Sequence, residues 1–122
     1  MVEDAKTERG RIRAAFRVAV NMSADEITAW LEGEESRRVG TFRPGESESV
    51  GRQAGGETAR ILRLAELGLG DGDYRHMRRV AGFVARHRAQ QPDNPVTSRW
   101  RWSLMNWGHD PLKAMTDEGD DG

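Results

Sequence analysis

Several chemistries are excluded by what this chain of 122 residues lacks. It has no cysteine, so it forms no disulfide bond and offers no thiolate to a metal ion. It has no apolar run near the roughly 18 residues that a membrane-spanning helix needs. Glu3 and Asp4 stand where a secretory signal peptide carries basic residues and then an apolar stretch. We therefore expect a cytoplasmic protein without membrane contact.

Lysine is scarce, whereas arginine is abundant. Only Lys6 and Lys113 are lysines among the 19 basic residues, which face 20 acidic ones and leave a net charge of −1. The acids concentrate in residues 23–36 and in the last seven residues, and seven arginines but a single acid occupy residues 75–101. A GC-rich genome would give such an excess of arginine without any function. The functional reading is that the planar guanidinium group suits the recognition of phosphate and carboxylate groups.

The spacing of apolar residues predicts an all-α domain of four to five helices. We expect helices over residues 6–20, 24–34, 57–67, 73–90 and 98–107, and Ser23 with Glu26 forms a capping box for the second. The glycine-rich central segment, residues 37–56, should be mostly loop, with room for short helical pieces. Residues 1–5 and the acidic tail at 116–122 should be disordered, which leaves residues 6–115 as one helical domain.

Three of the four tryptophans lie within residues 98–113. Trp100, Leu104 and Trp107 share one face of the predicted helix, and Gly108 is placed to end it. Large aromatic side chains dominate cores and interfaces. We therefore expect this segment to pack back on the helices at 24–34 and 73–90.

Neither a nucleotide loop nor a metal site is well supported. Gly51, Gly56 and Thr58 match positions of the phosphate-loop pattern, but Glu57 replaces its lysine and no apolar strand precedes it. His76 and His87 lie three turns apart on one helix, about 16 Å along its axis, so they cannot share an ion. We expect no cofactor and no metal.

The arginines of residues 75–101 suggest a binding surface for nucleic acid. Arg75, Arg79 and Arg86 lie on one side of the predicted helix, and aromatic residues alternate with the arginines at 99 and 101. Arginine combined with aromatic residues is typical of nucleic-acid binding, because bases stack on rings and on guanidinium planes. The hypothesis is that DNA phosphates are contacted by Arg75, Arg78, Arg79, Arg86, Arg99 and Arg101.

Three other interpretations remain open. The arginines would form internal ion pairs and be unavailable to nucleic acid if they pair with the acid-rich helix at 24–34. The tryptophan-rich segment would serve a protein partner or a homo-oligomer if it formed an interaction module. A polar site at Asn106, His109 and Asp110 would indicate an unknown enzyme, although no nucleophile elbow accompanies it and the sequence favours a role without catalysis.

Three blocks of sequence resemble a family of proteins of unknown function, the domain-of-unknown-function family number 3140. The resemblance runs from about residue 16 to residue 113. Its most specific block combines Arg99-Trp100-Arg101 with Ser103-Leu104-Met105-Asn106-Trp107-Gly108-His109-Asp110-Pro111. The other two are Trp30-Leu31 with Glu34-Glu35-Ser36, and Asp73-Tyr74-Arg75-His76-Met77-Arg78-Arg79-Val80 with Arg86-His87. Some members carry a DNA-binding label, so the resemblance implies DNA as a partner; it implies no catalytic residue.

Overall fold

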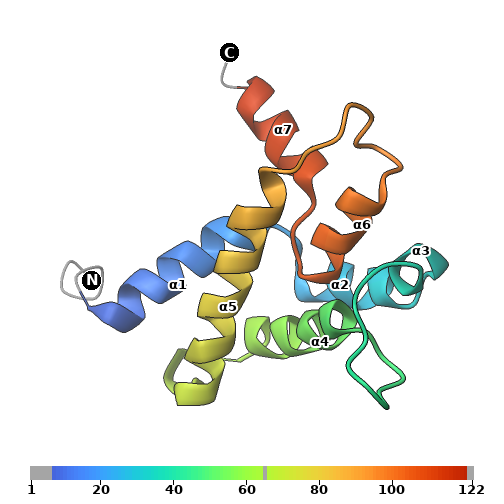
Figure 1. Cartoon of the computed structure of the whole chain (residues 1–122). Coiled ribbons are helices and arrows are strands. Elements are labelled where there is room, and N and C mark those ends of the chain that lie inside the picture. Colours follow the sequence, from blue (N-terminus) through green and yellow to red (C-terminus); the bar gives the residue numbers. More distant parts are fainter. Residues whose placement is uncertain (1–6, 65, 121–122) are drawn as a thin grey trace.

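The computed structural model describes the backbone of residues 7–64 and 66–120 and the side chains of residues 7–64 and 67–115 (Figure 1). Every regular element in these ranges is a helix, which confirms the all-α prediction. Residues 1–5, expected to be disordered, lie outside them. The elements are α1 (Glu8–Ala19), α2 (Ala24–Leu31), α3 (Glu34–Arg37), α4 (Val50–Leu62), the 3₁₀ turn η2 (Glu66–Gly68), α5 (Asp71–Arg88), α6 (Arg99–Asn106) and α7 (Pro111–Asp120).

Short polar side chains start most of the helices. Thr7, Ser23, Ser49 and Ser98 are the N-cap residues of α1, α2, α4 and α6, and each accepts a hydrogen bond from the amide three residues later. The predicted capping box of α2 is present, since Glu26 also accepts from the Ser23 amide. The predicted capping box is a local signal, and it placed the start of α2 correctly.

The start of α4 differs from the prediction. The helix begins at Val50 rather than near residue 57, so part of the expected glycine-rich loop is helical and the loop itself covers residues 38–49. The glycines allow close packing here: an ideal Cβ on Gly55 would lie 2.2 Å from the Asn106 carbonyl oxygen of α6. The cost of glycine within a helix is thus offset by the approach of α4 to α6.

The core lies where α1, α4, α5 and α6 meet. Phe16 of α1 and Ile27 of α2 are buried with the inner face of α5, which carries Tyr74, Met77 and Val80. Leu104 of α6 is fully enclosed, and Trp100 and Trp107 are at least nine-tenths buried on the same face. The tryptophan-rich segment therefore packs against α2 and α5 as expected, and also against α3 and α4.

The chain reverses after α6 and forms a last helix, which the sequence analysis did not predict, just as it did not predict α3 as a separate helix. Gly108 adopts φ +99°, and the His109 and Gly108 amides bond back to the Leu104 and Met105 carbonyls, which completes a Schellman motif. Asp110 then accepts from the Leu112 amide (3.0 Å), and Pro111 opens α7. The backbone is helical through Asp120, where the prediction placed a disordered tail from residue 116; residues 121–122 lie outside the described part.

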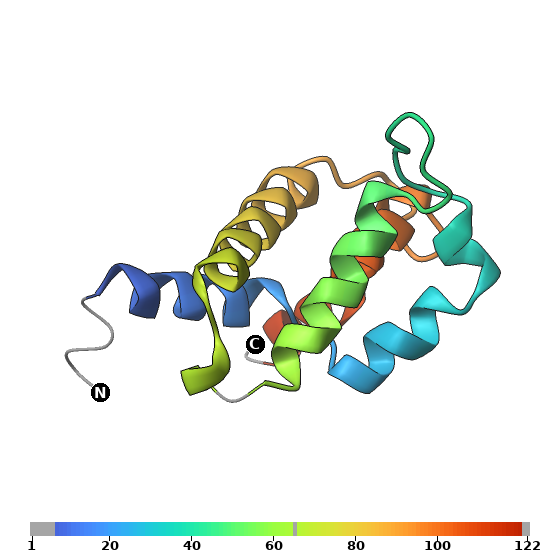
Figure 2. The same cartoon turned by 90° about the horizontal axis from the view of Figure 1, so that it is seen from below.

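Helices α4 and α5 diverge from the turn that contains η2, and α6 fills the angle between them (Figures 1 and 2). The loop at residues 38–49 stands at the N-terminal end of α4 (Figure 2). The open end of this angle thus brings together the first turn of α4, the second half of α5 and the end of α6.

Candidate functional site

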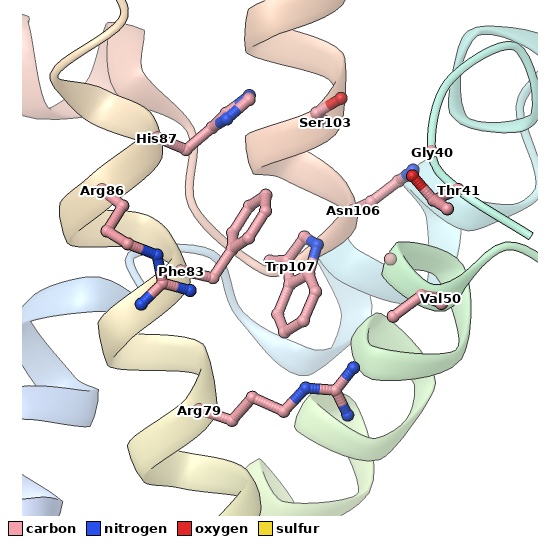
Figure 3. Close-up of a pocket in the computed structure, with 11 residues that line it drawn as sticks. Gly40, Thr41, Val50, Arg79, Phe83, Arg86, His87, Ser103, Asn106 and Trp107 are labelled. Carbon is pink, nitrogen blue, oxygen red and sulfur yellow. The ribbon is translucent and has the colours of Figure 1, made fainter.

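A groove of about 480 Å³ lies at the open end of this angle (Figure 3). Its volume falls in the range of sites for small ligands. Helix α5 forms one wall, the start of α4 forms the opposite wall, and α6 closes the floor. The lining residues are Gly40, Thr41, Val50, Gly51, Arg79, Phe83, Arg86, His87, Ser103, Asn106 and Trp107.

Stacked rings form the centre of the groove. The Phe83 ring lies parallel to the Trp107 ring, with centroids 4.3 Å apart, and to the His87 imidazole, with centroids 4.9 Å apart. The Arg79 guanidinium lies 5.2 Å from the centroid of Trp107. Such a cation over an indole face is attracted by the ring quadrupole. The groove therefore combines an aromatic surface with a cation held against it.

Burial in the groove wall disfavours the charged form of His87. Burial lowers its pKa below the usual 6.5, although a hydrogen bond to the Trp100 backbone opposes the shift. Its Nε2 is enclosed and has no hydrogen-bond partner among the described residues. The positive charge of the groove thus comes from its two arginines.

Arg79 and Arg86 make this groove basic. Both side chains are exposed, and in the described part of the chain neither forms an ion pair with an acid. No aspartate or glutamate is among the residues that line the groove. A concave surface lined by one sign of charge focuses its field on a ligand of the opposite sign. The arrangement can hold an anion.

The other four arginines of the predicted set lie elsewhere. Arg75 and Arg78 line a smaller hollow between α1 and α5, where Arg78 is paired with Glu8. Arg99 donates to the Arg38 carbonyl. Arg101 donates a hydrogen bond of 3.2 Å to each carboxylate oxygen of Asp110. Only Arg75 in this group is exposed and lacks a hydrogen bond or an acidic partner within the described residues.

Asn106 is a buried junction of three helices. Its Oδ1 accepts from the Trp30 indole (2.8 Å) and from the Ser36 hydroxyl, and its Nδ2 donates to the Ser36 carbonyl (3.1 Å). Arg52, whose side chain is nearly buried, donates to the same hydroxyl (2.8 Å) and to the Leu31 carbonyl. The hydrogen bonds of the Asn106 side-chain amide therefore connect α6 to α2 and α3.

His109 and Asp110 are held inside the turn after α6. His109 is 2% exposed, and its Nδ1 donates to the Ala19 carbonyl (2.7 Å). Burial lowers its pKa, and its Nε2 has no partner among the described residues. Asp110 exchanges backbone and side-chain bonds with Asn21 in addition to its pair with Arg101. Neither side chain lines the groove, and of the three residues of the predicted polar site only Asn106 does.

The sequence analysis missed Gly51, Phe83, His87 and Trp107 as groove residues. A signal existed for two of them, because Phe83 and His87 follow Arg79 at intervals of four on one helix face. Gly51 and Trp107 come from other helices, and only their packing places them here. No group of three or more potential metal ligands occurs in the described residues, and no helix there is long and apolar enough to cross a membrane.

Residues 15–105 match the model of a family described as "Protein of unknown function (DUF3140)", and the chain belongs to that family. The resemblance found in the sequence is thereby confirmed, without support for the DNA-binding label. The comparison with curated proteins gave no match, and neither did the comparison with solved structures.

Proposed function

We propose that this protein binds DNA, mainly through phosphate contacts on the basic side of α5. The observation that carries the proposal is the groove of Arg79 and Arg86, which has no acid in its lining. Exposed arginines that have no acidic partner among the described residues are available for phosphate oxygens, with which the guanidinium forms paired, charge-assisted bonds. Arg75, one turn before Arg79, extends the same side of the helix.

The spacing of these arginines suits a phosphate backbone. Arg79 and Arg86 are seven residues apart, which is about 10.5 Å along the helix axis. Phosphates of one B-DNA strand recur about every 3.4 Å along the duplex axis, so the two side chains can reach different phosphates. The net charge of −1 does not oppose this, because charges beyond about 10 Å are largely screened at 0.1 M salt.

Three other arginines of the predicted set are less available for DNA phosphates. Arg78, Arg99 and Arg101 already bond to Glu8, to a carbonyl and to Asp110. If these arginines bound DNA, they would lose those internal contacts, and the net free energy of DNA binding would be less favourable. We therefore assign the phosphate contacts to Arg75, Arg79 and Arg86.

A mobility-shift or anisotropy titration with a DNA duplex, repeated from low to moderate salt, tests the proposal. The affinity should fall steeply as salt rises, because phosphate contacts release counterions. Replacing both Arg79 and Arg86 by alanine should weaken binding at least about tenfold and reduce the slope of log K against log salt by about 1.8.

Arg63→Ala, combined with Arg60→Ala, is the matched control. It removes the same charge at the far end of α4, about 20 Å along that helix from Val50. Its binding should stay close to that of the unaltered protein. Absence of DNA binding even at low salt, or equal loss in both double variants, would overturn the proposal.

A further inference from the structure

The first turn of α4 borders the groove, and one of its backbone N–H groups has no hydrogen-bond acceptor among the described residues. The N–H groups that begin a helix have no carbonyl acceptor within it. Here the Val50 amide donates to the Thr41 carbonyl (2.7 Å), and the Arg52 amide donates to the Ser49 hydroxyl (3.2 Å). Gly51 lies between them and lines the groove, and its amide has no acceptor among the described residues.

The indole of Trp107 provides a second open donor beside it. Trp107 is 6% exposed, and its Nε1 has no hydrogen-bond acceptor in the part of the chain that the structure describes. An ideal Cβ on Gly51 would lie 3.0 Å from this nitrogen. The ring is buried, but this N–H is not among the enclosed unpaired atoms, so it opens on the groove, where a ligand can accept from it.

Arg79 adds a charge to the same corner. Its side chain crosses from α5 toward α4 (Figure 3), and the guanidinium remains against the Trp107 ring. The N-terminus of α4 also carries a partial positive charge from its aligned peptide dipoles. Donors from three helices thus border this part of the groove, and no acid lines it.

We propose that this corner of the groove, between Gly51, Trp107 and Arg79, is a binding site for a phosphate monoester. A monoester presents three unsubstituted oxygens, one for each donor group, whereas a phosphate within a DNA strand has only two. Helix N-termini with open amides are common phosphate sites. This site does not depend on the proposed DNA binding, because a free nucleotide carries a phosphate monoester just as the phosphorylated end of a DNA strand does.

Two-dimensional ¹H–¹⁵N NMR of the full chain provides the test, with inorganic phosphate as the first probe. The Gly51 amide and the Trp107 indole signals should shift together and saturate; Trp107→Phe identifies the indole signal. Titration to about 10 mM suffices for a site in the millimolar range. No shift at these two signals, or shifts only elsewhere, would overturn the proposal.

Gly51→Ala should weaken phosphate binding at least about tenfold, because its Cβ fills the space between the two donors. Gly56→Ala is the matched control, since it lies on the same helix with nothing within 4 Å of its added Cβ. Equal binding by the two variants would overturn the site.

Further arms identify the source of the phosphate. A 5′-phosphorylated oligonucleotide that binds more tightly than both its 5′-hydroxyl form and a nucleoside monophosphate would support a DNA end. Equal binding of the monophosphate and the phosphorylated oligonucleotide would support a free nucleotide. If both oligonucleotides bind alike and Gly51→Ala changes neither, the phosphate site fails while the DNA proposal stands.

Discussion

Replacing Asn106 by alanine should destabilise the fold by about 3–7 kcal/mol. Three hydrogen bonds of this side chain reach Trp30 and Ser36, at sequence distances of 76 and 70 residues. Asn106 is 1% exposed and Ser36 is fully buried, so the partners of the lost amide remain enclosed by the protein. The substitution therefore tests whether Asn106 is structural or is free for chemistry.

The magnitude follows from the partners left behind. The hydroxyl and the carbonyl of Ser36 would each lose a partner inside the core, at a cost of about 1–3 kcal/mol apiece. The Trp30 indole is only half-buried and can turn to water, so its loss adds about 1 kcal/mol. Against a total stability of about 5–15 kcal/mol for a native protein, such a loss is large.

Urea denaturation followed by tryptophan fluorescence measures the effect. The midpoint should fall by at least about 1 M, because the slope for a small protein is in the range of 1–3 kcal/mol per molar. Ser103→Ala is the control, because Ser103 lies on the same helix and lines the same groove, yet its hydroxyl has no hydrogen bond within the described residues. It should change stability by no more than about 0.5 kcal/mol. A loss below about 1 kcal/mol for Asn106→Ala would refute the structural role assigned to this amide.

Two further substitutions test the packing and the electrostatics of the core. Gly55→Ala should cost about 1–3 kcal/mol, because its Cβ would meet the Asn106 carbonyl oxygen at 2.2 Å and force α4 from α6; a thermal melt that matches Gly56→Ala would contradict this. Burial lowers the pKa of His109 from 6.5, so its contribution to stability is present above pH 6.5 and is lost as the pH falls toward its folded-state pKa. Urea midpoints between pH 7.5 and 5 should thus decline, by at most about 1.4 kcal/mol per pH unit from this residue. His109→Asn, which keeps a donor for the Ala19 carbonyl, should flatten that decline, and equal slopes would disprove the assignment.

Local signals account for the parts of the fold that were predictable. Ser23 and Glu26 lie within one turn and cap α2 by themselves. Gly108 ends α6 because its φ of +99° suits a residue without a side chain. The apolar spacing on α5 reports which of its faces is buried, because periodicity repeats within the helix.

The start of α4 could not be predicted from such signals. Gly51, Gly55 and Gly56 resemble a loop when only neighbours in sequence are considered. Their tolerance within a helix depends on α6, which approaches Gly55 from a segment about 50 residues away. A helix over residues 111–120 was missed as well, although Asp110 and Pro111 form an ordinary N-terminal pair.

The sequence by itself determined that the chain is helical, that its arginines concentrate after residue 75, and that the tryptophan segment packs inward. Only the tertiary structure decided which arginines remain available. Arg78 meets Glu8 from 70 residues away, whereas Arg79, the next residue, faces the groove beside Trp107. The physical reason is that a helix directs adjacent side chains about 100° apart. Whether an arginine is neutralised or open therefore depends on which other helix lies opposite it.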